Sequence, residues 1–123
     1  MRFIDNNDGT VTDSKTNLIW LKDANKFRSM TYDKAIKALK TFEDGKWRLP
    51  TINELTTLID YAQYDPALSE GHPFINVQSS FYWSSTMRAY STDYAWYVDM
   101  WNGHVVGNYL KDSSHYIWPV REA

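Results

Sequence analysis

The stretch that decides the fold is Trp47-Arg48-Leu49-Pro50-Thr51-Ile52-Asn53-Glu54-Leu55. Its proline ring clashes with a helical conformation at the preceding residue, so the chain stays extended up to this point. Thr51 can then accept a hydrogen bond from the amide of Glu54, while the Glu54 carboxylate accepts one from the amide of Thr51, which is a capping box. Apolar residues recur at helical spacing behind this cap. The pattern predicts a helix that runs from about Ile52 to Asp60.

Upstream of this helix the sequence predicts short β segments and one further helix. Residues 2–21 alternate apolar runs with turn sequences that favour strands joined by tight turns. Thr31 is a suitable N-cap, and apolar side chains at helical spacing follow as far as Phe42. Asp44-Gly45 is a typical helix stop. We therefore expect a helix between Thr31 and this stop.

Downstream, a long irregular segment precedes an all-β half. Residues 61–77 carry no regular pattern, and loops of this length inside a compact domain are often functional. The aromatic residues that follow predict four strands, at residues 81–85, 94–101, 104–109 and 116–121.

Asn102-Gly103 is the best two-residue hairpin turn in the chain. A two-residue loop places Trp101 opposite His104, and it pairs the residues before and after them in the same register. One face of the hairpin would then carry a mixed aromatic and polar set, predicted to face solvent: Tyr97, Asp99, Trp101, His104 and Asn108. The other face would carry an apolar set, predicted to be core: Trp96, Val98, Met100 and Val105.

Length, charge and composition exclude several classes of protein. A chain of 123 residues is expected to form a single domain, residues 1–123, with a sizeable core. The net charge of −2 and the absence of a long basic run argue against nucleic acid as a partner. No apolar run is long enough for membrane insertion, and no signal peptide opens the chain, so a leader would have to precede it in an exported protein.

Several blocks of sequence give a resemblance that spans nearly the whole chain. They lie at residues 3–13, 16–20, 47–55, 82–86, 95–98, 102–103 and 117–121. In this order they resemble the family named after the C-terminal domain of the Lcl collagen-like adhesin. The resemblance implies an α+β, C-type-lectin-like fold related to formylglycine-generating enzymes, with two helices packed on a small twisted antiparallel sheet. It also implies an extracellular or cell-surface location in bacterial or phage proteins, and adhesive, glycan-binding modules are the better understood members.

Two departures from the family pattern narrow the expected ligand. Trp118 stands where the family usually has an arginine before the closing Pro-Val-Arg. Residues 49–123 hold three Lys or Arg against eight Asp or Glu, whereas members that bind sulfated glycans tend to be basic. A sulfated polysaccharide is therefore not expected to be the ligand.

Enzymatic chemistry and metal binding have little support in the sequence. Formylglycine-generating enzymes depend on cysteines, and this chain has none, so neither that activity nor a cofactor is expected. A serine triad would need one of His72, His104 and His115, which fall in predicted loops or at strand ends. The acidic turn at residues 5–9 fits a hairpin better than a calcium loop, and Asp60, Asp65 and Glu70 lack a supporting spacing. No metal site is predicted.

The aromatic residues divide into a structural and a candidate binding set. Trp20, Trp47, Trp83 and Trp96 lie within family blocks and are predicted to be core. Arg48, Glu54 and Arg121 are interpreted as partners in one polar network. The candidate ligand-binding residues are Tyr90, Tyr97, Asp99, Trp101, His104, Asn108 and Trp118.

Together these features predict a non-catalytic recognition module that binds a surface carbohydrate. Sugars suit such residues because C–H faces lie on aromatic rings while Asp and Asn bond to hydroxyl groups. A glycan or a protein ligand on a cell surface would fit the same face, because Tyr and Trp give contact area at low entropic cost. The alternative is therefore a protein-binding or oligomerising ligand-display domain, including a homotrimer. A receptor-binding protein diversified from Tyr90 to Tyr116 would belong to this alternative.

Overall fold

The computed structural model describes residues 1–89, 91–107 and 111–123, which form two sheets and two helices. The first sheet has the order β1-β2-β3-β9, with β1 (Phe3–Asp5), β2 (Thr10–Asp13), β3 (Leu18–Leu21) and β9 (Val120–Glu122). The second has the order β4-β8-β5-β6-β7, with β4 (Ser29–Met30), β8 (His115–Tyr116), β5 (Phe81–Arg88), β6 (Ser91–Asp99) and β7 (Val105–Val106). The predicted single sheet is thus two sheets, antiparallel except for the β5–β8 pair.

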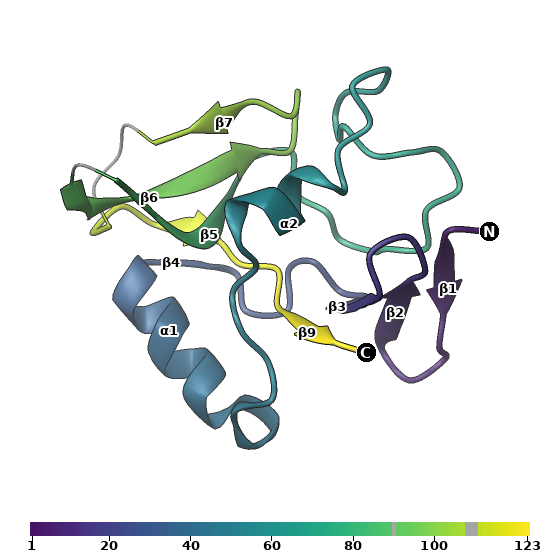
Figure 1. Cartoon of the computed structure of the whole chain (residues 1–123), viewed down its shortest axis with the longest axis horizontal. Coiled ribbons are helices and arrows are strands. Elements are labelled where there is room, and N and C mark those ends of the chain that lie inside the picture. Colours follow the sequence, from purple (N-terminus) through teal and green to yellow (C-terminus); the bar gives the residue numbers. More distant parts are fainter. Residues whose placement is uncertain (90, 108–110) are drawn as a thin grey trace.

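Strand β9 returns the end of the chain to its beginning. It pairs with β3 in the first sheet, so both termini lie on that side of the molecule (Figure 1). The predicted strand 116–121 is therefore divided between two sheets, because β8 belongs to the second and β9 to the first.

The capping box is confirmed at the start of α2 (Ile52–Thr56). The Glu54 amide donates to Thr51 Oγ1 at 3.1 Å, and the Thr51 amide donates to Glu54 Oε1 at 2.8 Å. The helix is shorter than predicted. The guanidinium of Arg2 donates to the carbonyl oxygen of Thr57 at 2.7 Å, and the Thr57 hydroxyl donates back to the carbonyl of Glu54. These bonds give hydrogen-bond donors to carbonyl groups at the end of the helix, so the helix ends early.

The first helix, α1 (Tyr32–Thr41), begins where the sequence predicts and ends just before the predicted stop. Thr31 occupies the N-cap position in an extended conformation, although its side chain makes no capping hydrogen bond. After Thr41 a short 3₁₀ turn, η1 (Phe42–Gly45), brings the chain to left-handed backbone at Glu43, Asp44 and Gly45. The left-handed run confirms the predicted stop.

Two apolar clusters lie on opposite faces of the second sheet. One contains Leu55, Tyr82, Val98 and Trp118, and the other contains Leu39, Trp83, Tyr97 and Ile117. Neighbouring side chains of one strand point to opposite faces of the sheet. A strand that lies between two apolar clusters therefore buries the side chains on both of its faces. Strand β6 does this, since Tyr97 and Val98 are both 0% exposed.

The predicted hairpin register is wrong by two residues. Val98 pairs with Val105 and Tyr97 with Val106, while the Gly103 amide donates to the carbonyl of Asp99 at 2.7 Å. The connection between β6 and β7 is therefore a four-residue turn, residues 100–103, in place of a two-residue one.

The structural tryptophans are mostly as predicted. Trp20, Trp47 and Trp83 are at most 3% exposed, which confirms their place in the core. Trp96 is only partly buried, so its predicted core position is wrong. Its indole packs against Gly107, where an added Cβ would come within 2.7 Å of the ring, and the Arg88 guanidinium lies 5.5 Å from the ring centre.

The predicted polar network holds for Arg48 and Glu54 and is wrong for Arg121. The Arg48 guanidinium bonds to the Glu54 carboxylate at 2.7 and 2.8 Å and to Glu122 at 2.7 Å. These bonds raise the pKa of Arg48 and, together with the Thr51 amide, lower that of Glu54. Arg121 instead lies 5.0 Å over the Trp47 ring, and its Nε bonds to no group in the described part of the chain.

The burial of His115 predicts a loss of stability in mild acid. Its ring lies 4.5 Å from that of Trp83 and 4.7 Å from that of Tyr97, and this burial lowers its pKa despite an opposing hydrogen bond at Ser114. Below the unfolded-state pKa of about 6.5 the unfolded chain binds a proton that the native state does not, so the free energy of unfolding falls with pH. We expect His115→Phe to flatten this slope in urea titrations between pH 7 and 5. An unchanged slope would show that His115 does not cause the pH dependence of the free energy of unfolding.

Candidate recognition surface

The long loop after α2 is fastened to the turn between β6 and β7. The Asp65 amide donates to the carbonyl of Trp101 at 2.8 Å, and the Ala67 amide donates to that of Met100 at 2.7 Å. The loop closes on itself where the Asp60 amide donates to the carbonyl of Ala67 at 2.8 Å. Figure 1 shows this loop leaving α2 at the end of the second sheet where β6 passes into β7. Two segments far apart in the sequence therefore build one surface.

Three exposed aromatic side chains gather on this surface. Tyr61 is 71% exposed, Tyr64 73% and Trp101 48%. The rings of Tyr64 and Trp101 meet edge to face, with centres 6.3 Å apart and planes at 74°. We call Tyr61, Tyr64 and Trp101 the aromatic patch. Large apolar side chains exposed together are typical of interaction sites.

Gly103 joins Tyr61 to the turn. Its φ of +84° lies in the left-handed region, and an added Cβ would come within 2.6 Å of Ile59 Cγ2 and 3.1 Å of Tyr61 Cε1. The Tyr61 ring therefore lies directly on the glycine. Only glycine tolerates both the left-handed backbone and the close approach of these side chains.

Gly103→Ala is expected to lower the free energy of unfolding by about 2–4 kcal/mol, because left-handed strain adds to a steric clash. The matched control is Gly71→Ala, where φ is +78° and no atom lies within 4 Å of the added Cβ. Strain alone should cost the control about 1–2 kcal/mol in the same urea titration. Equal losses in the two variants would show that Ile59 and Tyr61 do not pack against Gly103.

Polar groups adjoin the aromatic patch. Asp99 Oδ1 accepts the Trp101 amide at 2.9 Å, and Asp60 Oδ1 accepts the Ala62 amide at 2.9 Å. These two carboxylates therefore fix the backbone on either side of the patch. Asp65 and His104 are exposed.

The residues predicted from sequence to bind ligand are only partly brought together. Trp101 and His104 are exposed on this surface, and Asp99 is half-buried and accepts the Trp101 amide. Tyr90 and Asn108 lie outside the described residues. The surface positions predicted for Tyr97 and Trp118 are wrong, since both side chains are 0% exposed.

The physical reason for both corrections is packing. Tyr97 faces the cluster beside α1, and its ring centre lies 5.9 Å from that of Trp83. Trp118 lies in the other cluster, where its Nε1 donates to the carbonyl of Leu21 at 2.9 Å and its ring meets that of Phe74 edge to face at 4.9 Å. These two aromatic residues, which the sequence assigned to recognition, are instead packed in the two apolar clusters.

Sequence reasoning missed Tyr61 and Tyr64. The signal was present, because both lie in the segment 61–77 that is expected to be functional by its length. What the sequence does not show is the pair of backbone hydrogen bonds that brings this segment to Trp101.

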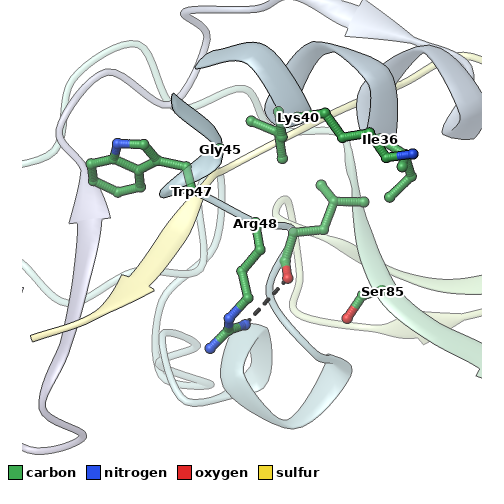
Figure 2. A pocket seen from close by; sticks show the side chains of 8 residues that line it. Ile36, Lys40, Gly45, Trp47, Arg48 and Ser85 are labelled. Carbon is green, nitrogen blue, oxygen red and sulfur yellow. Dashed lines mark hydrogen bonds between the residues drawn. The ribbon is translucent and has the colours of Figure 1, made fainter. Parts of the chain in front are cut away.

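A second candidate is a pocket of about 250 Å³ between α1 and the chain at residues 45–49. Figure 2 shows Ile36 and Lys40 projecting from α1 on one side, with Ser85 of β5 opposite. The Arg48 guanidinium extends away from α1 and donates to the carbonyl of Leu49 at 3.3 Å. Because Arg48 is also bound by two glutamates, the pocket presents mainly apolar walls and few polar groups able to orient a ligand.

The histidines and Ser84 have different surroundings in the fold. His72 packs near Phe74, His115 is buried and His104 is exposed at the turn. The Ser84 hydroxyl donates to the carbonyl of Trp96 at 2.6 Å. Within the described ranges no three His, Cys, Asp or Glu side chains are grouped to hold a metal ion, and no helix is long and apolar enough to cross a membrane.

Comparison with known proteins adds one finding to this geometry. The family model of the Lcl C-terminal domain matches residues 9–121, which is nearly the whole chain. A search of curated proteins gave no match. The chain therefore belongs to the Lcl C-terminal domain family.

Proposed function

We propose that this domain is a non-catalytic recognition module that binds a surface carbohydrate through the aromatic patch. The observation that carries the proposal is the exposed pair of Tyr64 and Trp101, whose rings stand edge to face at 6.3 Å. Aromatic rings present apolar faces to the C–H side of a sugar, while nearby polar groups bond to its hydroxyls. The exposed Asp65 and His104 are such groups.

The anchoring of the patch supports binding. Tyr64 and Trp101 lie on segments joined by backbone hydrogen bonds of 2.8 and 2.7 Å, and Tyr61 packs against Gly103. A surface held in place before the ligand arrives loses less conformational entropy on association.

The fold is part of the same proposal. The family resemblance implies a C-type-lectin-like domain at a bacterial or phage surface, and its better understood members look like glycan-binding adhesins. Two features support that fold here: β9 pairs the end of the chain with the N-terminal sheet, and a long irregular loop supplies the surface.

A protein ligand or self-association is the second candidate. It is favoured by β7, which in the described chain pairs only with β6 and exposes 44% of Val105 beside the turn. Exposed strand edges are suited to pairing with another chain. Tyr and Trp are also common in protein interfaces.

A glycan array tests the proposal. Wild-type protein is expected to bind a defined group of oligosaccharides, and Trp101→Ala is expected to weaken that binding by about 30-fold or more, as for a central aromatic contact. Ile4→Ala is the matched control, because it truncates a side chain that is 46% exposed on β1 of the other sheet. The control should bind as wild type does.

The array also separates the two candidates. An array without binding, together with a protein partner or a concentration-dependent oligomer that is lost in Trp101→Ala, would favour the second. Carbohydrate binding that survives Trp101→Ala would place the site elsewhere and contradict the proposal.

A further inference from the structure

The part of the chain that builds the aromatic patch has an unusual charge. No Lys or Arg occurs among residues 49–87 or 89–110, which include the whole long loop and the turn. Acidic residues stand next to each aromatic: Asp60 precedes Tyr61, Asp65 follows Tyr64, and Asp99 lies two residues before Trp101. The surface is therefore aromatic and negatively charged together.

Arg2, which a hydrogen bond brings to the start of this loop, is already neutralised. Arg2 donates to the carbonyl of Thr57 at 2.7 Å, just before the loop begins. The same guanidinium binds both oxygens of the buried Asp13 carboxylate, at 2.9 and 2.8 Å. Arg2 therefore does not offset the carboxylates beside the patch.

Asp65 is the carboxylate best placed to meet a ligand. Its amide is bonded to the carbonyl of Trp101, which holds the backbone of residue 65 beside that of residue 101. Its side chain is exposed and its carboxylate bonds to no other described group, whereas those of Asp60 and Asp99 accept backbone amides. The Asp65 charge is thus open to an incoming group.

Aromatic faces and carboxylates share a preference for cations. The π face of Trp or Tyr carries the negative end of a quadrupole, which attracts an ammonium group lying over the ring. A carboxylate beside the ring adds direct charge attraction. A sulfate or a uronate would instead meet the negative charge of these carboxylates.

We infer that the patch takes a saccharide bearing a positively charged amino group, that is, an unacetylated amino sugar. The inference rests on the proposed carbohydrate-binding function and names its ligand class. In this arrangement the sugar ring lies against Trp101 and Tyr64, and its ammonium group faces Asp65.

The test compares tetramers that differ in the substituent at C2, which carries a charge in only one of them. Binding of tetramers of glucosamine, N-acetylglucosamine and glucose is measured by calorimetry at pH 6, where the sugar amine is protonated. The glucosamine tetramer is expected to bind about tenfold more tightly than either neutral one, as a cation over exposed rings permits. Its affinity should also fall with added salt.

A pair of variants assigns the preference to the patch. Asp65→Asn keeps the shape of the side chain and is expected to reduce the tenfold preference by about threefold, because it removes one exposed charge. Glu70→Gln removes an exposed acid farther along the same loop and should leave the preference unchanged.

The possible results separate the inference from the proposed function on which it rests. Equal affinity for charged and neutral tetramers, lost in Trp101→Ala, would overturn the inference and leave the proposed function standing. Tighter binding of an anionic saccharide would overturn it as well. Absence of binding to every saccharide would overturn both, and a preference that Glu70→Gln reduces as much as Asp65→Asn would show general charge attraction without a site.

Discussion

Replacing Trp118 with alanine is expected to lower the free energy of unfolding by about 3–5 kcal/mol, the usual cost of deleting a fully buried indole. The side chain is 0% exposed and meets the rings of Trp20, Phe74 and Tyr82. Its Nε1 donates to the carbonyl of Leu21, which the substitution would leave without that partner. Both the cavity and the lost hydrogen bond act in the same direction.

Urea denaturation of the two tryptophan variants measures this directly. Trp101→Ala should change the free energy of unfolding by less than about 1 kcal/mol, because its side chain is half exposed. The sequence assigned Trp101 and Trp118 to one surface, so similar small losses in both variants would restore that assignment. A large loss in Trp101→Ala would remove the aromatic patch.

Asp13→Ala is expected to lower the free energy of unfolding by about 3 kcal/mol, because it breaks a buried ion pair. The Asp13 side chain is 0% exposed, and the Arg2 side chain is 27% exposed. The carboxylate accepts four hydrogen bonds, two from Arg2 and one each from the Thr16 hydroxyl and the Lys15 amide. Removing it leaves a cation and two donors without their acceptor.

The pH dependence of this variant supplies a second measurement. Burial raises the pKa of Asp13, but the hydrogen bonds from Arg2, Thr16 and Lys15 outweigh it and lower the pKa below its ordinary value of 3.8. The carboxylate therefore stabilises the native state above that value, and the contribution is lost as the pH falls through the folded-state pKa. Asp13→Ala should show a smaller loss below pH 4 than wild type. Asp5→Ala, which removes a partly exposed partner of Lys22, is the control with the smaller effect at neutral pH.

The sequence predicted correctly those features of the fold that are set by a few consecutive residues. The capping box at Thr51 and Glu54 needs only four consecutive residues, and it forms as the sequence predicts. The helix stop at Asp44-Gly45 is likewise set by left-handed backbone within one turn. Tertiary contacts do not have to be known for either.

The hairpin register depended on contacts that no local rule contains. Asn102-Gly103 favours a two-residue turn, but Met100 is 0% exposed and its carbonyl accepts the Ala67 amide of the distant loop. Its own amide donates to the carbonyl of Ser80. These bonds draw residue 100 into the core and out of the ladder, so the turn takes four residues. Alternation within β6 was also uninformative, since both faces of the strand are buried.

The candidate site was predicted only in part, because it too depends on contacts between segments that are distant in the sequence. Trp101 lies in the turn and His104 directly follows it, so their exposure survives a change of register. Tyr61 and Tyr64 join them only because the Asp65 amide bonds to the Trp101 carbonyl. A contact between segments so far apart in sequence has no signature in either segment.

The most direct test of the central claim uses the indole N–H signals of the six tryptophans in a ¹H–¹⁵N NMR titration with an oligosaccharide that the array identifies. The indole of Trp101 should shift with ligand concentration, together with the amides of Tyr61, Tyr64 and Asp65. The buried indoles of Trp83 and Trp118, bonded to the carbonyls of Met30 and Leu21, should stay in place. A Trp101 signal that does not move, with the shifts gathered instead at Trp47 beside the pocket of Figure 2, would contradict recognition by the aromatic patch.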